Sequence, residues 1–246
     1  MECADLGTPK DSAIRKDSAI RYAQAGRGNG VLMRSVFHHQ LDELTDELAT
    51  MCDLAATMMN DATFALLHDD PMASERALSG LAPLRASYTA VERRALLLLA
   101  RQAPVARDLR TVVAAVHIAA DADRMGGLAA HVARMARGCV PDPALPLDVR
   151  SHFAEMGRIA VNLAQAARDA ILDDDPMRAN GIPHDDDRMD ELHRDLFEMV
   201  TDSEWRHGAV AATDVVLLGR FYERFADHAV AIARRIVFRS TGAAHG

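Results

Sequence analysis

The feature that most constrains the fold of this chain is an internal repeat. Residues 65–72, ALLHDDPM, match residues 170–177, AILDDDPM, at a shift of 105 positions. Residues 123–133, DRMGGLAAHVA, match residues 223–233, ERFADHAVAIA, at a shift of 100 positions. Either match alone is weak in an Ala-rich chain. Because the two occur in the same order and at similar shifts, they indicate a duplicated structural unit.

Each copy of the repeat shows the residue spacing of helices. Apolar residues recur at steps of three and four, and aromatic residues, which favour strands, make up only 4% of the chain. The expected helices cover about residues 35–67, 72–100, 108–138, 148–172, 187–201 and 210–239. Pro83 predicts a kink or a later start in the second of them. Because long helices with short links pack as antiparallel bundles, we predict an elongated all-α fold of two tandem three-helix bundles.

The first 32 residues differ in composition from the repeat. Two hexapeptides, KDSAIR, follow one another, and a Gly-rich segment comes after them at residues 26–30. This stretch carries too little apolar surface to offset the entropy lost on ordering, so we expect it to be disordered. A Pro-rich connector at residues 139–146 separates the two copies. The predicted organisation is a disordered extension over 1–32, bundles over 33–140 and 141–240, and a disordered tail over 241–246.

Charge and composition restrict the functional class and the compartment. The net charge of −8 argues against a nucleic-acid-binding protein and against docking on an anionic membrane. No apolar run approaches the roughly 20 residues of a membrane span, and the first 30 residues contain no apolar core of a secretory signal. Cys3, Cys52 and Cys139 form no C-x-x-C pair, which favours free thiols in a reducing compartment. We therefore expect a cytoplasmic protein.

Two pairs of acidic residues have the spacing of a metal site. Glu223 and Asp227 lie one helical turn apart in the last predicted helix, and Asp186 and Asp190 lie one turn apart near the start of the fifth. Facing each other, the two pairs would form an oxygen-rich cage suited to Mg, Mn, Fe or Ca. A nitrogen from His228 or His193 would extend the range of metals to Zn.

An ordinary structural interpretation competes with the metal site. Residues 185–187 could cap a helix, and Glu223 could pair with Arg220, so spacing alone favours this second interpretation. The sequence contains no nucleotide-binding glycine loop, no nucleophile elbow and no H-E-x-x-H zinc motif. Catalysis is therefore not expected.

Three segments resemble the PhoU family in the order in which that family has them. Residues 223–229 are similar to the motif in the last helix of its second bundle, residues 104–110 to the opening of its third helix, and residues 123–126 to the first-bundle motif. The resemblance covers about residues 33–239. It implies a cytoplasmic negative regulator of phosphate uptake that often forms a homodimer. The implied partners are the ATPase subunit of a phosphate ABC transporter and a phosphate-sensing histidine kinase.

The resemblance also implies metal ligands, but only in the second copy of the repeat. The positions that match the family's acidic metal motifs are Asp186, Asp190, Glu223 and Asp227. In the first copy Asp123 keeps a carboxylate, while Gly127, Leu81 and Arg85 replace the other three. We therefore expect at most one site per chain, for a divalent or ferric ion such as Mg, Mn, Zn or Fe, with Asp123 and His228 as secondary candidates.

The regulator is expected to act as an adaptor, and two other functions remain open. Exposed basic positions such as Arg107 and Arg110 are expected to contribute to partner binding. One alternative is a ferritin-like carboxylate oxidase or metal store, although only Asp190 and His193 approach its Glu-x-x-His spacing. The other alternative is a helical scaffold that binds no ligand.

Overall fold

The computed structural model describes residues 10–102, 104–138 and 145–242, and every regular element in these residues is helical. The helices of the first copy are α1 (Lys10–His68), α2 (Pro71–Ser79), α3 (Leu81–Gln102) and α4 (Ala106–Gly138). Those of the second copy are η1 (Leu147–Val149), α5 (Arg150–Asp173), α6 (Pro176–Thr201) and α7 (Gly208–Thr241). The prediction of an all-α fold is confirmed. No helix in the described residues combines the length and apolarity needed to cross a membrane.

The chain divides into two compact units, Met1–Asp42 and Glu43–Gly246. In the first unit α1 begins at Lys10, so residues 10–32 are helical where the sequence favoured disorder. No proline interrupts the chain between Lys10 and Asp70, and the Ala, Lys and Arg of the hexapeptides are good helix formers. Residues 1–9 and 243–246 lie outside the described residues. The predicted bundle limits at residues 33, 140 and 240 stay predictions.

The repeated Asp-Asp-Pro sequence builds the same turn in both copies. Asp69 and Asp174 adopt left-handed backbone angles, with φ of 51° and 48°. The next residue, Asp70 or Asp175, caps the following helix by accepting two backbone N–H groups at 2.8 and 3.3 Å. The prediction that the fifth helix starts near residue 187 is therefore wrong. Because this capped turn nucleates it, α6 starts at Pro176.

The two copies differ in the helix that follows this turn. In the second copy α6 is continuous, whereas in the first copy the equivalent stretch breaks into α2 and α3 at Gly80. A Cβ on Gly80 would lie 2.5 Å from the Met58 side chain, so the break is also a point of close approach to α1. The predicted interruption exists, but Pro83 lies in the first turn of α3, where no N–H is needed.

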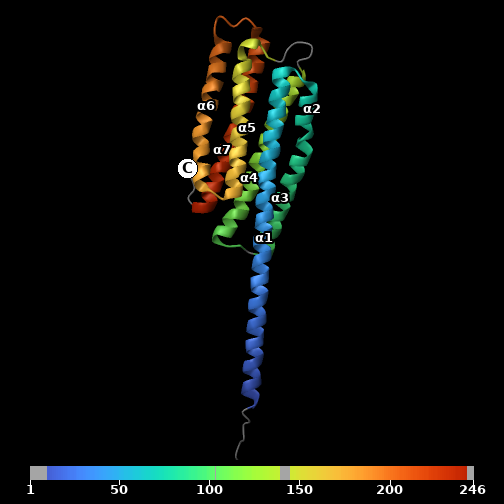
Figure 1. Cartoon of the computed structure of the whole chain (residues 1–246), viewed down its shortest axis with the longest axis vertical. Helices are drawn as coiled ribbons and strands as arrows, with labels where there is room; N and C mark the ends of the chain where they lie inside the picture. Colours follow the sequence, from blue (N-terminus) through green and yellow to red (C-terminus); the bar gives the residue numbers. More distant parts are fainter. Residues whose placement is uncertain (1–9, 103, 139–144, 243–246) are drawn as a thin grey trace, which may run out of the picture. The chain divides into compact units, whose positions relative to one another are not determined.

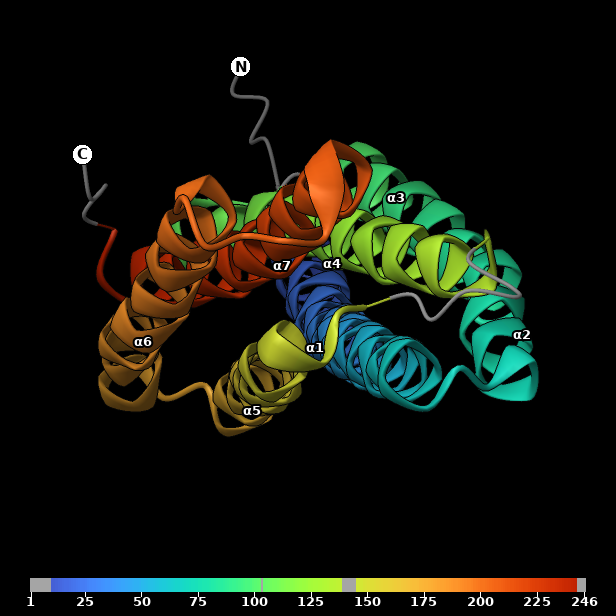
Figure 2. The same cartoon turned by 90° about the horizontal axis from the view of Figure 1, so that it is seen from above.

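The helices of residues 43–246 pack side by side. Figures 1 and 2 show α4 and α7 between α6 on one side and α2 and α3 on the other, with α5 beside the later part of α1. The Thr63 hydroxyl on α1 lies 2.9 Å from the Tyr222 hydroxyl on α7. A Cβ on Gly157 of α5 would lie 2.4 Å from the Thr63 side chain. The two copies therefore share one core.

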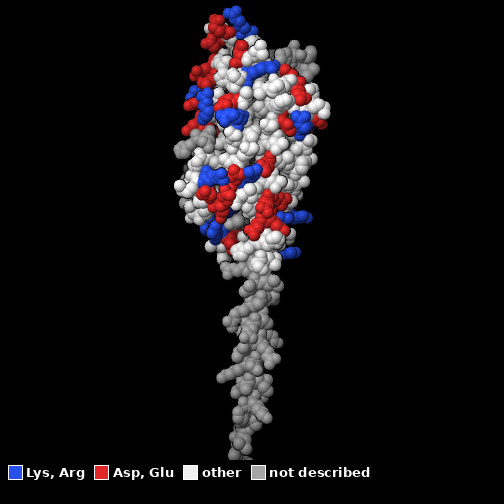
Figure 3. Space-filling view, in the orientation of Figure 1, with Lys and Arg blue, Asp and Glu red and all other residues white. Residues whose placement is uncertain are grey.

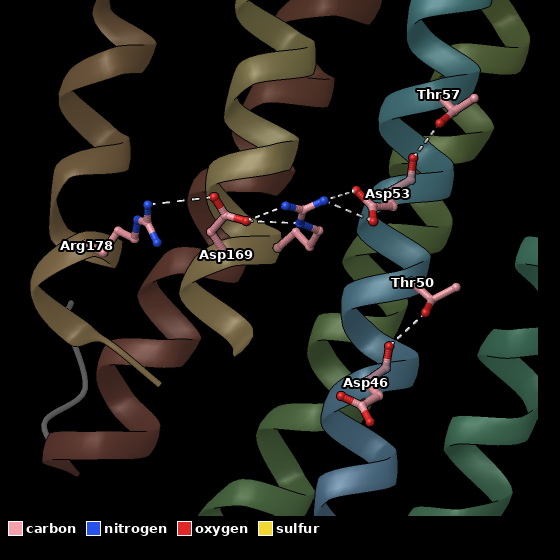
Figure 4. Close-up of polar contacts among 7 residues, drawn as sticks. Asp46, Thr50, Asp53, Thr57, Asp169 and Arg178 are labelled. Atoms are coloured by element: carbon pink, nitrogen blue, oxygen red, sulfur yellow. Dashed lines mark hydrogen bonds and ion pairs between the residues drawn. The ribbon is translucent and has the colours of Figure 1, made fainter. Parts of the chain in front are cut away.

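Ion pairs tie three helices together on one face (Figure 4). Arg168 on α5 donates to Asp53 on α1 at 3.0 and 3.2 Å and to its neighbour Asp169 at 2.7 Å. Arg178 on α6 lies 3.8 Å from the second oxygen of Asp169. These side chains are partly exposed, so they fix the relative positions of α1, α5 and α6 more than they stabilise the fold.

Cys52 is buried in this core. Burial, with a smaller contribution from the charge of Asp53, raises the pKa of its thiol to about 12. A thiol with such a pKa holds almost no thiolate at neutral pH. Cys52 is a free thiol, as the sequence predicted, and its burial makes it unreactive.

Candidate functional site

Helices α6 and α7 place the four predicted acidic residues close enough for the charges of the other three to act on Asp186. Asp186 and Asp190 lie on α6, Glu223 and Asp227 lie on α7, and the two helices pack against each other. The pKa of Asp186 is raised to about 7, first by burial and then by the charges of Asp190, Asp227, Asp187 and Glu223. Negative charge at this place is therefore uncompensated.

Few positive groups offset this negative charge. Oδ1 of Asp186 is buried and has no hydrogen-bond partner. Arg220 donates to Glu223, and Nδ1 of His193 lies 3.9 Å from Oε2 of Glu223. A Cβ on Gly219 would lie 3.1 Å from the His193 ring, so the glycine lets α6 approach α7 closely. A buried carboxylate oxygen with no partner is the kind of group that a cation or a proton satisfies.

The chemistry of these residues fits a cation, although the cage is not closed. Carboxylate oxygens, with the His193 nitrogen beside them, are donors that hard and borderline metals accept. In the described part of the chain, however, no three His, Cys, Asp or Glu side chains converge on a common metal position. Because like charges repel, an ion would have to draw these carboxylates together.

The structure changes the balance between the two interpretations of these acidic residues. Helix α6 begins at Pro176, so residues 185–187 lie in its interior and do not cap it. The pairing of Glu223 with Arg220 is found as the structural interpretation predicted. Helix capping therefore does not explain Asp186 and Asp190, while part of the charge on Glu223 is accounted for.

The corresponding place in the first copy has different chemistry. The shift of 105 between Pro71 and Pro176 aligns Leu81 with Asp186 and Arg85 with Asp190, as the sequence comparison expected. Asp123 and Gly127 lie on α4, and a Cβ on Gly127 would meet no atom within 4 Å. Oδ1 of Asp123 is buried without a partner. Asp123 is not among the charges that raise the pKa of Asp186, so it stays a candidate of the first copy alone.

His228, the other secondary candidate, is engaged at the interface between the copies. Its Nδ1 lies 3.1 Å from Oδ1 of Asp121 on α4, which leaves only Nε2 for a metal. Arg235 donates to Oδ2 of Asp121 at 2.9 Å, and Arg124 lies 3.3 Å from Oδ1. Burial alone would raise the pKa of Asp121, but the hydrogen bonds and charges of His228 and Arg235 outweigh it and lower this pKa. This ionic cluster was not predicted, because its partners lie more than 100 residues apart.

The basic residues at the start of α4 are engaged in the fold rather than free. Arg107 donates to Oδ2 of Asp174 at 2.8 Å, and the buried Arg239 donates to Oδ1 at 2.6 Å. Nε of Arg110 donates to the carbonyl of Arg239 at 3.5 Å. Arg107 is still 66% exposed, as the sequence predicted, whereas Arg110 is only partly exposed.

Comparison with known proteins relates both copies to one family. The family model of the PhoU domain matches residues 48–136 and 153–236. The phosphate-specific transport system accessory protein PhoU homolog 2 of Mycobacterium tuberculosis is 51% identical over 211 residues, 86% of this chain and 99% of the relative. PhoU homolog 1 of Mycobacterium leprae is 50% identical over 210 residues, 85% of this chain and 95% of the relative.

Two solved structures have a similar fold. The crystal structure of PhoU from Pseudomonas aeruginosa has a TM-score of 0.77 at 22% identity and covers 84% of this chain and 100% of its own. That of the phosphate transport system regulatory protein PhoU from Streptococcus pneumoniae has the same TM-score and identity, with 85% and 99% covered. At such identities the likeness shows the arrangement of helices alone.

Proposed function

Since this chain belongs to the PhoU family, we propose that it is a negative regulator of phosphate uptake and of the phosphate-starvation response. The observation that carries this proposal is the match of the family domain to both copies of the repeat. Two relatives that are 51% and 50% identical to this chain, and are matched over nearly their whole length, are named accessory proteins of the phosphate-specific transport system. The same role is therefore the simplest one for this chain.

In the proposed mechanism the protein is a cytoplasmic adaptor. One face contacts the ATPase subunit of the phosphate ABC transporter, and another contacts a phosphate-sensing histidine kinase. Leu109 and Val113 support such contacts, since they lie one turn apart near the start of α4 and are 40% and 39% exposed. Val105, just before this helix, is 72% exposed. On the face drawn in Figure 3, acidic, basic and uncharged side chains are interspersed.

We propose no catalytic step for this protein. An oxidase of the ferritin-like kind would need paired Glu-x-x-His ligands, and among the described side chains of the acidic cluster one such histidine, His193, lies close to a carboxylate. The purified protein, supplied with ferrous iron, should consume no oxygen beyond the buffer rate. We also propose that it forms a homodimer, which light scattering on the purified chain measures directly.

The acidic cluster of the second copy is proposed to hold one divalent or ferric ion. Asp186, Asp190 and Asp227 would supply oxygens, and Glu223 would join them on release from Arg220. The bound ion would supply positive charge and so relieve the repulsion that raises the pKa of Asp186. In this proposal the ion stabilises the pairing of α6 with α7.

Gene deletion in the host tests the regulatory role. Phosphate uptake and the expression of starvation genes in phosphate-rich medium should both rise, and the wild-type gene should restore repression. Any second PhoU-family gene is deleted in parallel, so that redundancy does not mask the effect. Unchanged uptake and expression in the strain without either gene would contradict the proposed function.

A further inference from the structure

A cavity of about 360 Å³ lies where α6 ends and α7 begins, next to η1. Its walls combine four carboxylates with a histidine, a methionine and the one tryptophan of the chain. The lining residues are Asp148, Glu198, Met199, Asp202, Glu204, Trp205 and His207. The cavity lies apart from the acidic cluster of Asp186, since it shares none of those residues.

The tryptophan in this cavity is held in place by its neighbours. The indole N–H of Trp205 donates to the carbonyl of Gly208 at 3.0 Å. The ring of His207 meets the indole edge-on, with the ring centroids 4.7 Å apart. Gly208 has a φ of +81°, a left-handed conformation that favours glycine, so the turn that places this carbonyl is specific. The fixed indole offers a π surface that attracts cations.

Two carboxylates of the cavity already pair with basic side chains of the loop between α6 and α7. Nε2 of His207 lies 2.9 Å from Oδ2 of Asp148, and Arg206 donates to Glu204 at 3.1 Å. Asp202 accepts the backbone N–H of Glu204 at 2.7 Å, so it shapes the loop. Within the described residues the Glu198 carboxylate makes no hydrogen bond or ion pair. One carboxylate in the wall that also holds the indole is therefore available to a further cation.

We propose that this cavity binds the guanidinium group of an arginine side chain presented by a partner protein. A guanidinium is planar and stacks on an indole, and its N–H groups match the two oxygens of a carboxylate such as Glu198. The cavity therefore offers a guanidinium both surfaces that it prefers. The proposal extends the adaptor role and depends on it for the identity of the partner only.

The exposure of the cavity favours a partner protein over a free small molecule. The side chains of Asp148 and Glu204 are 63% and 80% exposed, and charges so open to water hold a free cation weakly. A partner would cover this rim and exclude water. Leu147, Phe197 and Val210, each within three positions of a lining residue, are 79%, 55% and 78% exposed and can meet its apolar surface.

The single tryptophan gives a direct test with the full-length protein. A short blocked peptide that carries one arginine is titrated while the indole N–H signal of Trp205 is followed by NMR and its fluorescence is measured. We expect a saturable change, and no such change with the same peptide carrying citrulline, which keeps the shape but lacks the charge. Equal responses to the two peptides, or no response to arginine, would overturn the proposal.

Matched variants and a free amine complete the test. Glu198→Gln should weaken arginine-peptide binding by about tenfold or more, whereas Glu92→Gln, on the exposed surface of α3, should leave it unchanged. Free agmatine should bind no more tightly than the peptide, and tighter binding would assign the cavity to a small molecule instead. Peptide binding is independent of repression in the host, so failure of the regulatory role is distinguishable from failure of this site.

Discussion

The two copies of the repeat share a helical plan and the Asp-Asp-Pro turn but differ in the charge that they place between the last two helices. In the second copy four carboxylates surround Asp186, and their charges help raise its pKa to about 7. In the first copy Leu81 and Arg85 occupy the corresponding positions of α3, and Gly127 occupies one on α4. Because the first copy packs its helices without these carboxylates, the fold does not need the acidic cluster. The cluster therefore has a role other than holding the helices together.

The largest expected effect concerns the ionic cluster that joins the copies. Asp121→Asn removes the charge that His228 and Arg235 face, and a buried ion pair that loses one partner costs about 3 kcal/mol. The free energy of unfolding in urea should fall by about that amount. Asp123→Asn is the matched control two positions away, because the buried Oδ1 of Asp123 has no hydrogen-bond partner to lose. A loss below about 0.5 kcal/mol for Asp121→Asn would show that the copies do not depend on this cluster.

Metal binding should depend on the carboxylates of the second copy and not on Asp123 of the first. An ion present at about 100 times its dissociation constant stabilises the folded protein by about 2.7 kcal/mol, which raises the Tm of a chain this size by several degrees. Asp186→Ala and Asp227→Ala should abolish that rise in a thermal melt with Mn, Zn or Fe. Asp123→Ala should keep it, and an equal loss in this variant would contradict the assignment to the second copy.

The metal-free protein should show the cost of placing a charge on Asp186, which comes first from burial and then from the neighbouring carboxylates. Because the pKa of Asp186 is raised to about 7 in the folded state, its carboxyl stays protonated to a higher pH there than in the unfolded state. Stability should therefore fall as the pH rises from about 4 to about 7. Asp186→Asn should remove this fall and stabilise the metal-free protein at pH 7 by about 1–2 kcal/mol. Urea unfolding at several pH values measures both effects, and a destabilised variant would refute the explanation.

The smallest expected difference lies in the two Asp-Asp-Pro turns. Asp174 pairs with Arg107 and Arg239, whereas Asp69 pairs with Arg150 at 3.1 Å. Asparagine tolerates the left-handed backbone of these positions, so Asp→Asn removes the charge and keeps the turn. Asp174→Asn should lower the Tm more than Asp69→Asn, by an amount that corresponds to about 0.5–1 kcal/mol. Equal shifts would show that the second arginine adds nothing.

The sequence predicts the repeat and most helix ends because these depend on local chemistry. The Asp-Asp-Pro turns are the example, because their own aspartates cap the helices that follow. The start of α6 was predicted wrongly. Asp173–Asp175 was interpreted as the end of the preceding helix, whereas Asp175 also caps α6. The partners of Asp121 could not be predicted, because His228 and Arg235 lie more than 100 residues away from it in the sequence. The Trp205 cavity was missed because its shape depends on the loop between α6 and α7 and on Asp148 from a distant segment.

The most direct test of the account is the amount of metal that each variant retains. The purified protein is loaded separately with Mn, Zn and ferric ions, dialysed, and analysed for bound metal by elemental mass spectrometry. The account predicts one ion per chain for the wild type and for Asp123→Ala, and a loss of that ion in Asp190→Ala. Metal that survives Asp190→Ala, or that disappears in Asp123→Ala, would contradict the claim that the second copy alone forms the site.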